Sequence, residues 1–280
     1  MFNKKEKIVA AATNIIINGC RCNYRGKNMN NITDIAKKIR GRLGMEYYPV
    51  GLYYSKERPA DSLRFKEKGN GCIMPLVLSA AKGKTVSVDA DSTGWNCSAF
   101  YFGYSEWIFE GIEYYLSDGL ETRECEKFVK DPAEVKKYLE SLRFKEPVTD
   151  VTVLKPLENF AEGEKPEVVI FFVNADQLSA LTYLVYFNSP LSDDRIVTRF
   201  ASACAAAVTL PLKYRSENKY KAVIGMNDIS ARLRLPKDLM TLSMPVELFE
   251  EICSYIDECF FNTTQWKRIL ERNIREGAER

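Results

Sequence analysis

Apolar positions recur along the chain with two different spacings, one typical of helices and one of strands. A repeat of three or four residues predicts helices over 4–17, 32–43, 72–81, 133–142 and 245–260. Runs rich in β-branched and aromatic residues predict strands over 50–54, 84–89, 168–173 and 221–225. The run 168–173 is apolar at every position, which indicates a strand buried on both faces. The pattern predicts a mixed α/β or α+β fold in which the sheet is covered by helices.

Capping residues and alternation predict three further elements in the second half of the chain. Asn174 is expected to cap a helix that runs through Phe187. Ser192 is expected to cap a second helix over 193–208, and Pro211 should close it. Residues 231–235 alternate as a short strand would.

Two blocks of the sequence share one order of elements, which indicates an internal repeat. Each has a strand, a small-residue helix with a cysteine (Cys72 or Cys204), a second strand and a polar turn containing Cys97 or Asp228. The spacing from the cysteine to the polar turn is nearly equal in the two blocks. We therefore expect an N-terminal helical extension over 1–44 and one domain over 45–280. Two related halves, 45–150 and 165–262, would make up that domain before a C-terminal helix, with a pocket where they meet.

Composition excludes several classes of chemistry. The 280 residues contain no histidine, so histidine-based acid–base catalysis and imidazole metal ligands are ruled out. A hydrophobic content of 46% is enough for a full core. Forty basic and 38 acidic residues leave a formal net charge of +2, which gives no basic field for nucleic acid.

The N-terminal apolar segment and the cysteines favour a reduced, cytoplasmic protein. Residues 10–17 form too short an apolar run to span a membrane, so no membrane partner is expected. The eight cysteines are scattered through a chain that can build its own core, which favours free thiols over a disulfide scaffold. The sequence neither indicates nor excludes a homo-oligomer.

Three cysteines form a candidate metal site, because the proposed repeat would bring Cys72, Cys97 and Cys204 together. Thiolates are the preferred ligands of iron–sulfur clusters and of several metal ions. Asp228, Cys20 or Cys22 would supply a fourth ligand. The alternative is that these cysteines are small core residues that pack beside alanines.

A dense group of aromatic residues between Trp95 and Tyr115 gives a second candidate site. Aromatic side chains usually fill the core. In the alternative interpretation, Trp95, Asn96 and Tyr101 form a stacking wall for an anionic planar ligand that Arg232 holds through its planar fork of donors. The protein would then be a small-molecule binding or regulatory module without catalysis.

A thiolate nucleophile is the third hypothesis, and whether the protein is an enzyme stays open. Cys72 begins a predicted helix, where the thiol pKa can be lowered, so it is the best single catalytic candidate. No glycine-rich dinucleotide motif, phosphate-binding loop or nucleophile elbow occurs in the sequence.

A series of short motifs resembles the domain-of-unknown-function family 169. The motifs are Pro-Val-Gly-Leu-Tyr at 49–53, Cys72, Asn96-Cys97, Ser-Ala-Cys-Ala-Ala at 202–206, Ser-Ala-Arg at 230–232 and Ser-Met-Pro at 243–245. The resemblance covers about residues 45–260. It implies a stand-alone cytosolic protein of archaea and bacteria, many of them anaerobes, and no particular activity. By association, it favours metal or redox chemistry.

Overall fold

The computed structural model describes four stretches of the chain. All of them lie from Ile32 onward, and together they form one compact unit. The predicted helix over 4–17 and the cysteines Cys20 and Cys22 lie outside the described residues. The described stretches are 32–66, 71–119, 125–143 and 149–278.

A seven-stranded sheet runs through the molecule in the order β2-β3-β1-β4-β7-β6-β5. Neighbouring strands are antiparallel except β5 and β6, which are parallel, so the predicted mixed sheet is confirmed. The strands are β1 (Val50–Ser55), β2 (Val86–Val88), β3 (Val151–Pro156), β4 (Val168–Val173), β5 (Ile196–Val197), β6 (Ala222–Gly225) and β7 (Met240–Pro245).

The strand order is symmetric about the central pair β1 and β4. These strands run antiparallel, with Val50 opposite Ile170 and Leu52 opposite Val168. On one side β1 is followed outward by β3 and β2, and on the other β4 is followed by β7 and β6. In each half the outer strand precedes the middle strand in the sequence, which is the arrangement that an internal repeat would produce.

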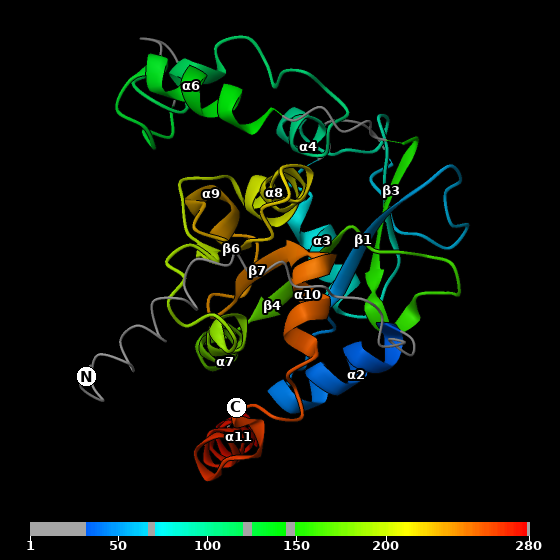
Figure 1. Cartoon of the computed structure of the whole chain (residues 1–280). Helices are drawn as coiled ribbons and strands as arrows, with labels where there is room; N and C mark the ends of the chain where they lie inside the picture. Colours follow the sequence, from blue (N-terminus) through cyan, green and yellow to red (C-terminus); the bar gives the residue numbers. More distant parts are fainter. Residues whose placement is uncertain (1–31, 67–70, 120–124, 144–148, 279–280) are drawn as a thin grey trace, which may run out of the picture. The chain divides into compact units, whose positions relative to one another are not determined.

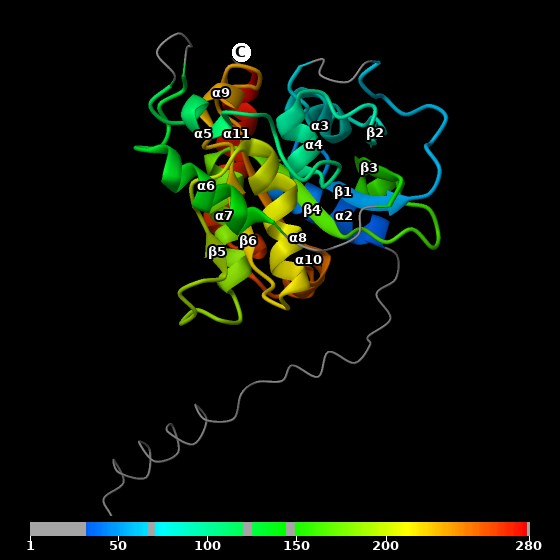
Figure 2. The ribbon, with the colours of Figure 1, turned by 90° about the horizontal axis from the view of Figure 1, so that it is seen from above.

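Helices cover both faces of the sheet (Figures 1 and 2). The first face carries α3 (Met74–Ala81), α4 (Asn96–Tyr101), α6 (Pro132–Leu142), α8 (Leu210–Ser216) and α9 (Ile229–Arg232). The second face carries α2 (Ile32–Leu43), α7 (Ala175–Tyr186), α10 (Val246–Cys253) and α11 (Thr264–Ala278). The short helix α5 (Ile112–Tyr115) lies next to α6. Short turns of other helix types are η1 (Leu157–Asn159), η2 (Ala205–Thr209) and η3 (Phe260–Asn262).

Strand β4 lies between two separate hydrophobic cores. Its six residues are all buried, and successive side chains of a strand point to opposite faces. Ile170 and Phe172 therefore belong to the core of the first face, whereas Val169 and Phe171 belong to that of the second. The predicted burial on both faces is confirmed.

Two helices begin at side-chain caps, and the cap at Asn174 confirms the prediction. The Asp131 carboxylate accepts the backbone N–H of Glu134 at the start of α6. Asn174 and Gln177 form a reciprocal capping box at the start of α7.

Two predicted elements are wrong. Residues 193–208 do not form one helix, because the β-branched pair Ile196–Val197 joins the sheet beside β6. The helical part starts later as a π-helical turn, η2, and continues into α8 with Pro211 in its first turn, where no backbone N–H is needed. Residues 231–235 do not form a strand, because Asp228 caps the short helix α9 instead.

Helix α2, which the sequence places in an N-terminal extension ending at 44, packs into the core of the second face. Ala36, Ile39 and Leu43 are fully buried on one side of the helix. Gly44 follows with a φ of +60°, the left-handed conformation that commonly ends a helix.

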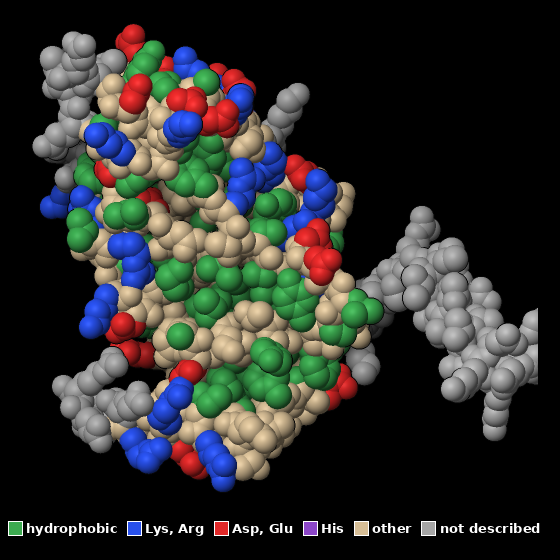
Figure 3. All heavy atoms as spheres, turned by 90° about the vertical axis from the view of Figure 1, so that its left-hand side faces the viewer, with side chains coloured by type: hydrophobic (Ala, Val, Ile, Leu, Met, Phe, Trp, Pro, Cys, Tyr) green, Lys and Arg blue, Asp and Glu red, His purple; other side chains and the backbone are tan. Residues whose placement is uncertain are grey.

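Apolar side chains gather on one side of the molecular surface, between groups of charged residues (Figure 3). Large exposed apolar residues of the described chain include Leu191, Ile229 and Leu233. Within the described ranges, no helix has both the length and the apolar character that a membrane span requires.

Candidate functional site

Four segments that are distant in the sequence each bring one thiol or carboxylate to the first face. Cys72 lies just before α3, and Cys97 is the second residue of α4. Cys204 immediately precedes η2, and Asp228 caps α9. We call these four residues the thiol cluster. All four positions lie at or just before the start of a helical segment.

The members of the thiol cluster interact electrostatically with one another. Burial, followed by the nearby Cys72 and Asp228, raises the pKa of the Cys97 thiol to about 11. Burial also raises the pKa of Cys204 well above its usual value, and Cys97, Cys72 and Asp228 add to that effect. The structure therefore brings together the three cysteines that the sequence selects, as protonated thiols at neutral pH.

Cys72 has the most polar surroundings of the three thiols. It is partly exposed, and burial raises its pKa. The backbone N–H of Met74 and the positive charge of Arg234 both act in the opposite direction. The Arg234 guanidinium also lies 4.6 Å from the centre of the Trp95 ring. The Arg234 guanidinium thus lies at one side of the thiol cluster.

The Ser98 hydroxyl lies between two members of the thiol cluster. It favours the thiolate forms of Cys97 and Cys204, whose pKa values it lowers. Its oxygen is buried and has no hydrogen-bond partner among the oxygen and nitrogen atoms of the described residues. Buried hydroxyls are normally hydrogen-bonded, and the Cys97 and Cys204 thiols are the groups with which this one interacts.

Asp228 connects two of the segments that form the cluster. One carboxylate oxygen accepts the backbone N–H of Ala203 at 3.0 Å. The other accepts the backbone N–H of Ser230 at 3.1 Å and caps α9. Because Ala203 precedes Cys204 directly, Asp228 fixes the position of that cysteine as well as its electrostatic environment.

Unusual backbone conformations surround the cluster. The π-helical turn η2 starts directly after Cys204, and such turns are rare and frequent at functional sites. Met226, two residues before Asp228, is buried with a φ of +69°. A left-handed conformation of a bulky residue costs about 1–3 kcal/mol and persists only where the surroundings impose it.

The thiol cluster is not arranged as a finished metal centre. Among the residues that the model describes, no three Cys, Asp or Glu side chains are spaced to hold one metal ion. The other described cysteines lie elsewhere. Cys253 and Cys259 are buried in the core of the second face, as their predicted packing role requires, and Cys125 is a partly exposed free thiol.

The residues predicted to bind a planar ligand do not form one wall. Trp95 and Asn96 are exposed at the start of α4, whereas Tyr101 is buried and interacts with Tyr138 and Ser202. The Arg232 guanidinium donates to the backbone carbonyls of the turn that follows α9, at Lys237 and Leu239.

Sequence reasoning missed Ser98 and Arg234. A serine beside a cysteine carries no signal by itself, because its burial depends on how α4 packs against η2. Arg234 lies two residues after the chosen Arg232, and only the fold shows which of the two faces Trp95.

Comparison with curated proteins and with solved structures finds no match. The family model DUF169, described as an uncharacterised ArCR, matches residues 38–254, which include every member of the thiol cluster. Since this match spans most of the 280 residues, the chain belongs to the DUF169 family.

Proposed function

We propose that the protein binds a thiophilic metal ion or an iron–sulfur cluster through Cys72, Cys97 and Cys204. The observation that carries this proposal is that three thiols from three separate segments lie close enough to interact electrostatically. Sulfur is the ligand that zinc, copper(I) and iron–sulfur clusters prefer over oxygen.

Protonated thiols do not argue against such a site. A metal binds the thiolate, so each ligand releases a proton on binding, and the apparent affinity rises with pH. Arg234 would offset part of the negative charge that three thiolates bring to the site. Ser98 would donate a hydrogen bond to a ligand sulfur, as groups surrounding a metal centre commonly do.

Binding requires the sulfur atoms to reorient, since they do not surround a common point in this state. Rotation about the Cα–Cβ bond moves a cysteine sulfur among three staggered positions at small cost. Cys72 and Cys97 are partly exposed, whereas Cys204 is buried.

The raised pKa values argue against a thiolate nucleophile. A nucleophilic cysteine needs a lowered pKa, and the pKa values of all three thiols are raised by burial. Cys72 therefore enters this proposal as a ligand.

Cadmium titration under anaerobic conditions tests the proposal. Thiolate coordination should produce an ultraviolet charge-transfer band that saturates at one equivalent of metal and strengthens as the pH rises. Cys97→Ser and Cys204→Ser should weaken or remove the band, whereas Cys125→Ser, outside the cluster, should leave it unchanged. Anaerobically purified protein should also contain metal, or iron with acid-labile sulfide.

Protein without metal or sulfide, and without a saturable band, would contradict this function. An affinity for anionic planar compounds in the same protein would instead favour the alternative, a ligand-binding or regulatory module. Trp95 and Arg234 would then be the groups to vary.

A further inference from the structure

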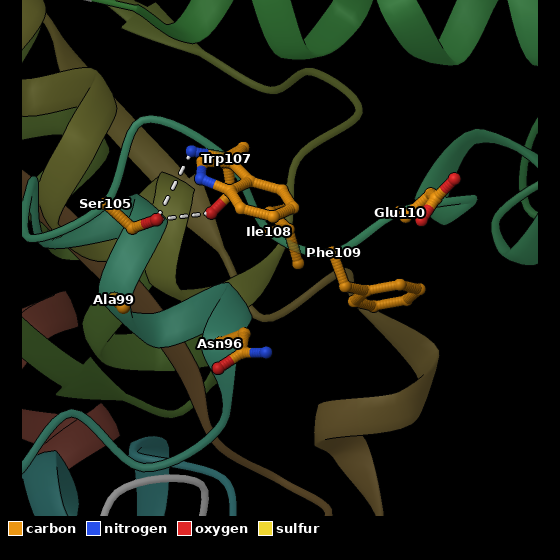
Figure 4. A pocket seen from close by; sticks show the side chains of 7 residues that line it. All are labelled: Asn96, Ala99, Ser105, Trp107, Ile108, Phe109 and Glu110. Carbon is orange, nitrogen blue, oxygen red and sulfur yellow. Dashed lines mark hydrogen bonds between the residues drawn. The ribbon is translucent and has the colours of Figure 1, made fainter.

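A pocket of about 440 Å³ lies beside α4, on a different side of the helix from the thiol cluster. Asn96 and Ala99 line it from the helix, whereas Cys97 belongs to the thiol cluster and Ser98 interacts with it. The opposite wall is the loop that contains Trp107, Phe109 and Glu110 (Figure 4). Its volume falls in the range of small-molecule sites.

The loop wall is held in place by three contacts. The Ser105 hydroxyl donates to the backbone carbonyl of Trp107 at 2.5 Å and accepts its N–H (Figure 4). Ile108 is buried in the core of the first face. The ring of Phe109 packs edge-on against Tyr115, with centroids 5.9 Å apart. The wall is therefore built before any ligand arrives.

Three recognition groups at the pocket have no partner in the described part of the chain. The side chain of Trp107 is large and apolar, yet 66% of the residue is exposed. Neither the Glu110 carboxylate nor the Asn96 amide makes a hydrogen bond or ion pair with another described residue.

The charge of the surrounding segment favours a ligand of positive charge. Residues 104–119 contain four acidic residues and no lysine or arginine. Lys136 neutralises Glu113 at 3.2 Å, and Glu110 faces the pocket without such a partner. Aromatic faces attract cations through their quadrupole, and a nearby carboxylate reinforces that attraction.

We propose that this pocket binds a small organic cation, such as a methylated ammonium group attached to an apolar body. The cationic head lies against Trp107 and Glu110, the apolar part contacts Phe109 and Ala99, and the Asn96 amide offers a hydrogen bond. The site does not depend on metal binding at the thiol cluster.

Isothermal titration calorimetry of the full chain with benzyltrimethylammonium tests this site. Saturable binding is expected, with phenylacetate, an anion of similar size, showing none. Glu110→Gln and Trp107→Leu should each raise the Kd roughly three- to thirtyfold. Glu106→Gln is the matched control, because it removes an equal charge four residues away from a side chain that does not line the pocket.

Three results would overturn the site: no saturable binding of benzyltrimethylammonium, equal binding of phenylacetate, or equal effects of Glu106→Gln and Glu110→Gln. Glu110 is exposed, so its substitution does not endanger folding and decides the question if Trp107→Leu is unstable. Cadmium binding should be unchanged in Glu110→Gln, so failure of this site is distinguishable from failure of the thiol cluster.

Discussion

The second face of the sheet buries aromatic rings against one another, whereas the first face buries small residues, thiols and hydroxyls. On the second face Phe171 packs against Phe249, and Phe261 against Trp266. On the first face η2 is mostly alanine, and the hydroxyls of Ser98, Thr241 and Ser243 are buried without a described partner. Within the described residues, these hydroxyls of the first face lack a hydrogen-bond partner, whereas the second face packs ring against ring.

This difference indicates that the second face mainly stabilises the fold, whereas the first face holds the groups available for chemistry. An unsatisfied buried hydroxyl costs about 1–3 kcal/mol, and a core selected only for stability would replace it. Unpartnered Ser98, the π-helical turn and the strained Met226 all lie near the same three thiols. The first face therefore contributes less to the free energy of folding around the thiol cluster, and the packing of the second face contributes more.

The largest effect on stability is expected from a substitution in the core of the second face. Phe171→Ala leaves a cavity in a fully buried position and should lower the free energy of unfolding by about 3–5 kcal/mol. Urea denaturation measures the change. If the faces have separate roles, cadmium affinity should be unaltered at temperatures where the variant stays folded, and a parallel loss of both would contradict the separation.

The alkylation rate of Cys97 tests whether its thiol is buried in the first face. With its pKa raised from 9.0 to about 11, the thiolate fraction at pH 8 is about one hundredth of that of an unperturbed thiol. Alkylation by iodoacetamide, followed by mass spectrometry of the Cys97 peptide, should be slow at pH 8 and should accelerate until the pH approaches 11. Rapid modification at pH 7 would show that the burial is not maintained in solution.

Gly225 tests how closely the first face is packed. A Cβ at this residue would lie 2.5 Å from the Thr241 Oγ1 and 2.8 Å from the Ala206 Cβ. Gly225→Ala should therefore destabilise the protein by about 1–3 kcal/mol in thermal or urea unfolding. Gly41→Ala is the control, because nothing lies within 4 Å of its Cβ position and alanine favours α2, so it should stabilise by about 0.4–1 kcal/mol.

The smallest expected effect comes from the charge of Asp228. Its carboxylate raises the pKa values of Cys97 and Cys204, so Asp228→Asn should lower both, and Cys97 should alkylate faster at pH 8. The change should be smaller than the effect of burial, the larger cause. Asp131→Asn, which alters the cap of α6, provides the control and should leave the Cys97 rate as it was.

Much of the fold could be predicted because local signals and tertiary structure agree. The apolar run of β4, the caps Asp131 and Asn174, and the helix that follows Cys72 all carry their own sequence pattern. The segment around Pro211 could not be predicted, because proline can either end a helix or stand in its first turn, and only the packing of η2 on β6 decides between them.

The candidate sites divide in the same way. Thiols could be selected from the sequence because cysteine is chemically distinctive and the repeated order of elements aligned them. The pocket could be predicted only in part: the aromatic group between Trp95 and Tyr115 and the Asn96 amide could be selected from the sequence, and both line it. Glu110 could not be selected, because it is one of 38 acidic residues and its place at the pocket depends on the loop that turns Trp107 outward while Ile108 points inward.

The two ends of the sheet have a consequence for behaviour at high concentration. The outermost strands, β2 and β5, contain three and two residues, so each end offers few free backbone groups to another chain. Leu63 bridges to Val86 and covers part of the β2 edge. Long, flat edges recruit further strands and lead to aggregation, whereas such short ones stop lateral growth. The short edge strands thus also limit the sheet-to-sheet pairing that would bring the thiols of neighbouring molecules together.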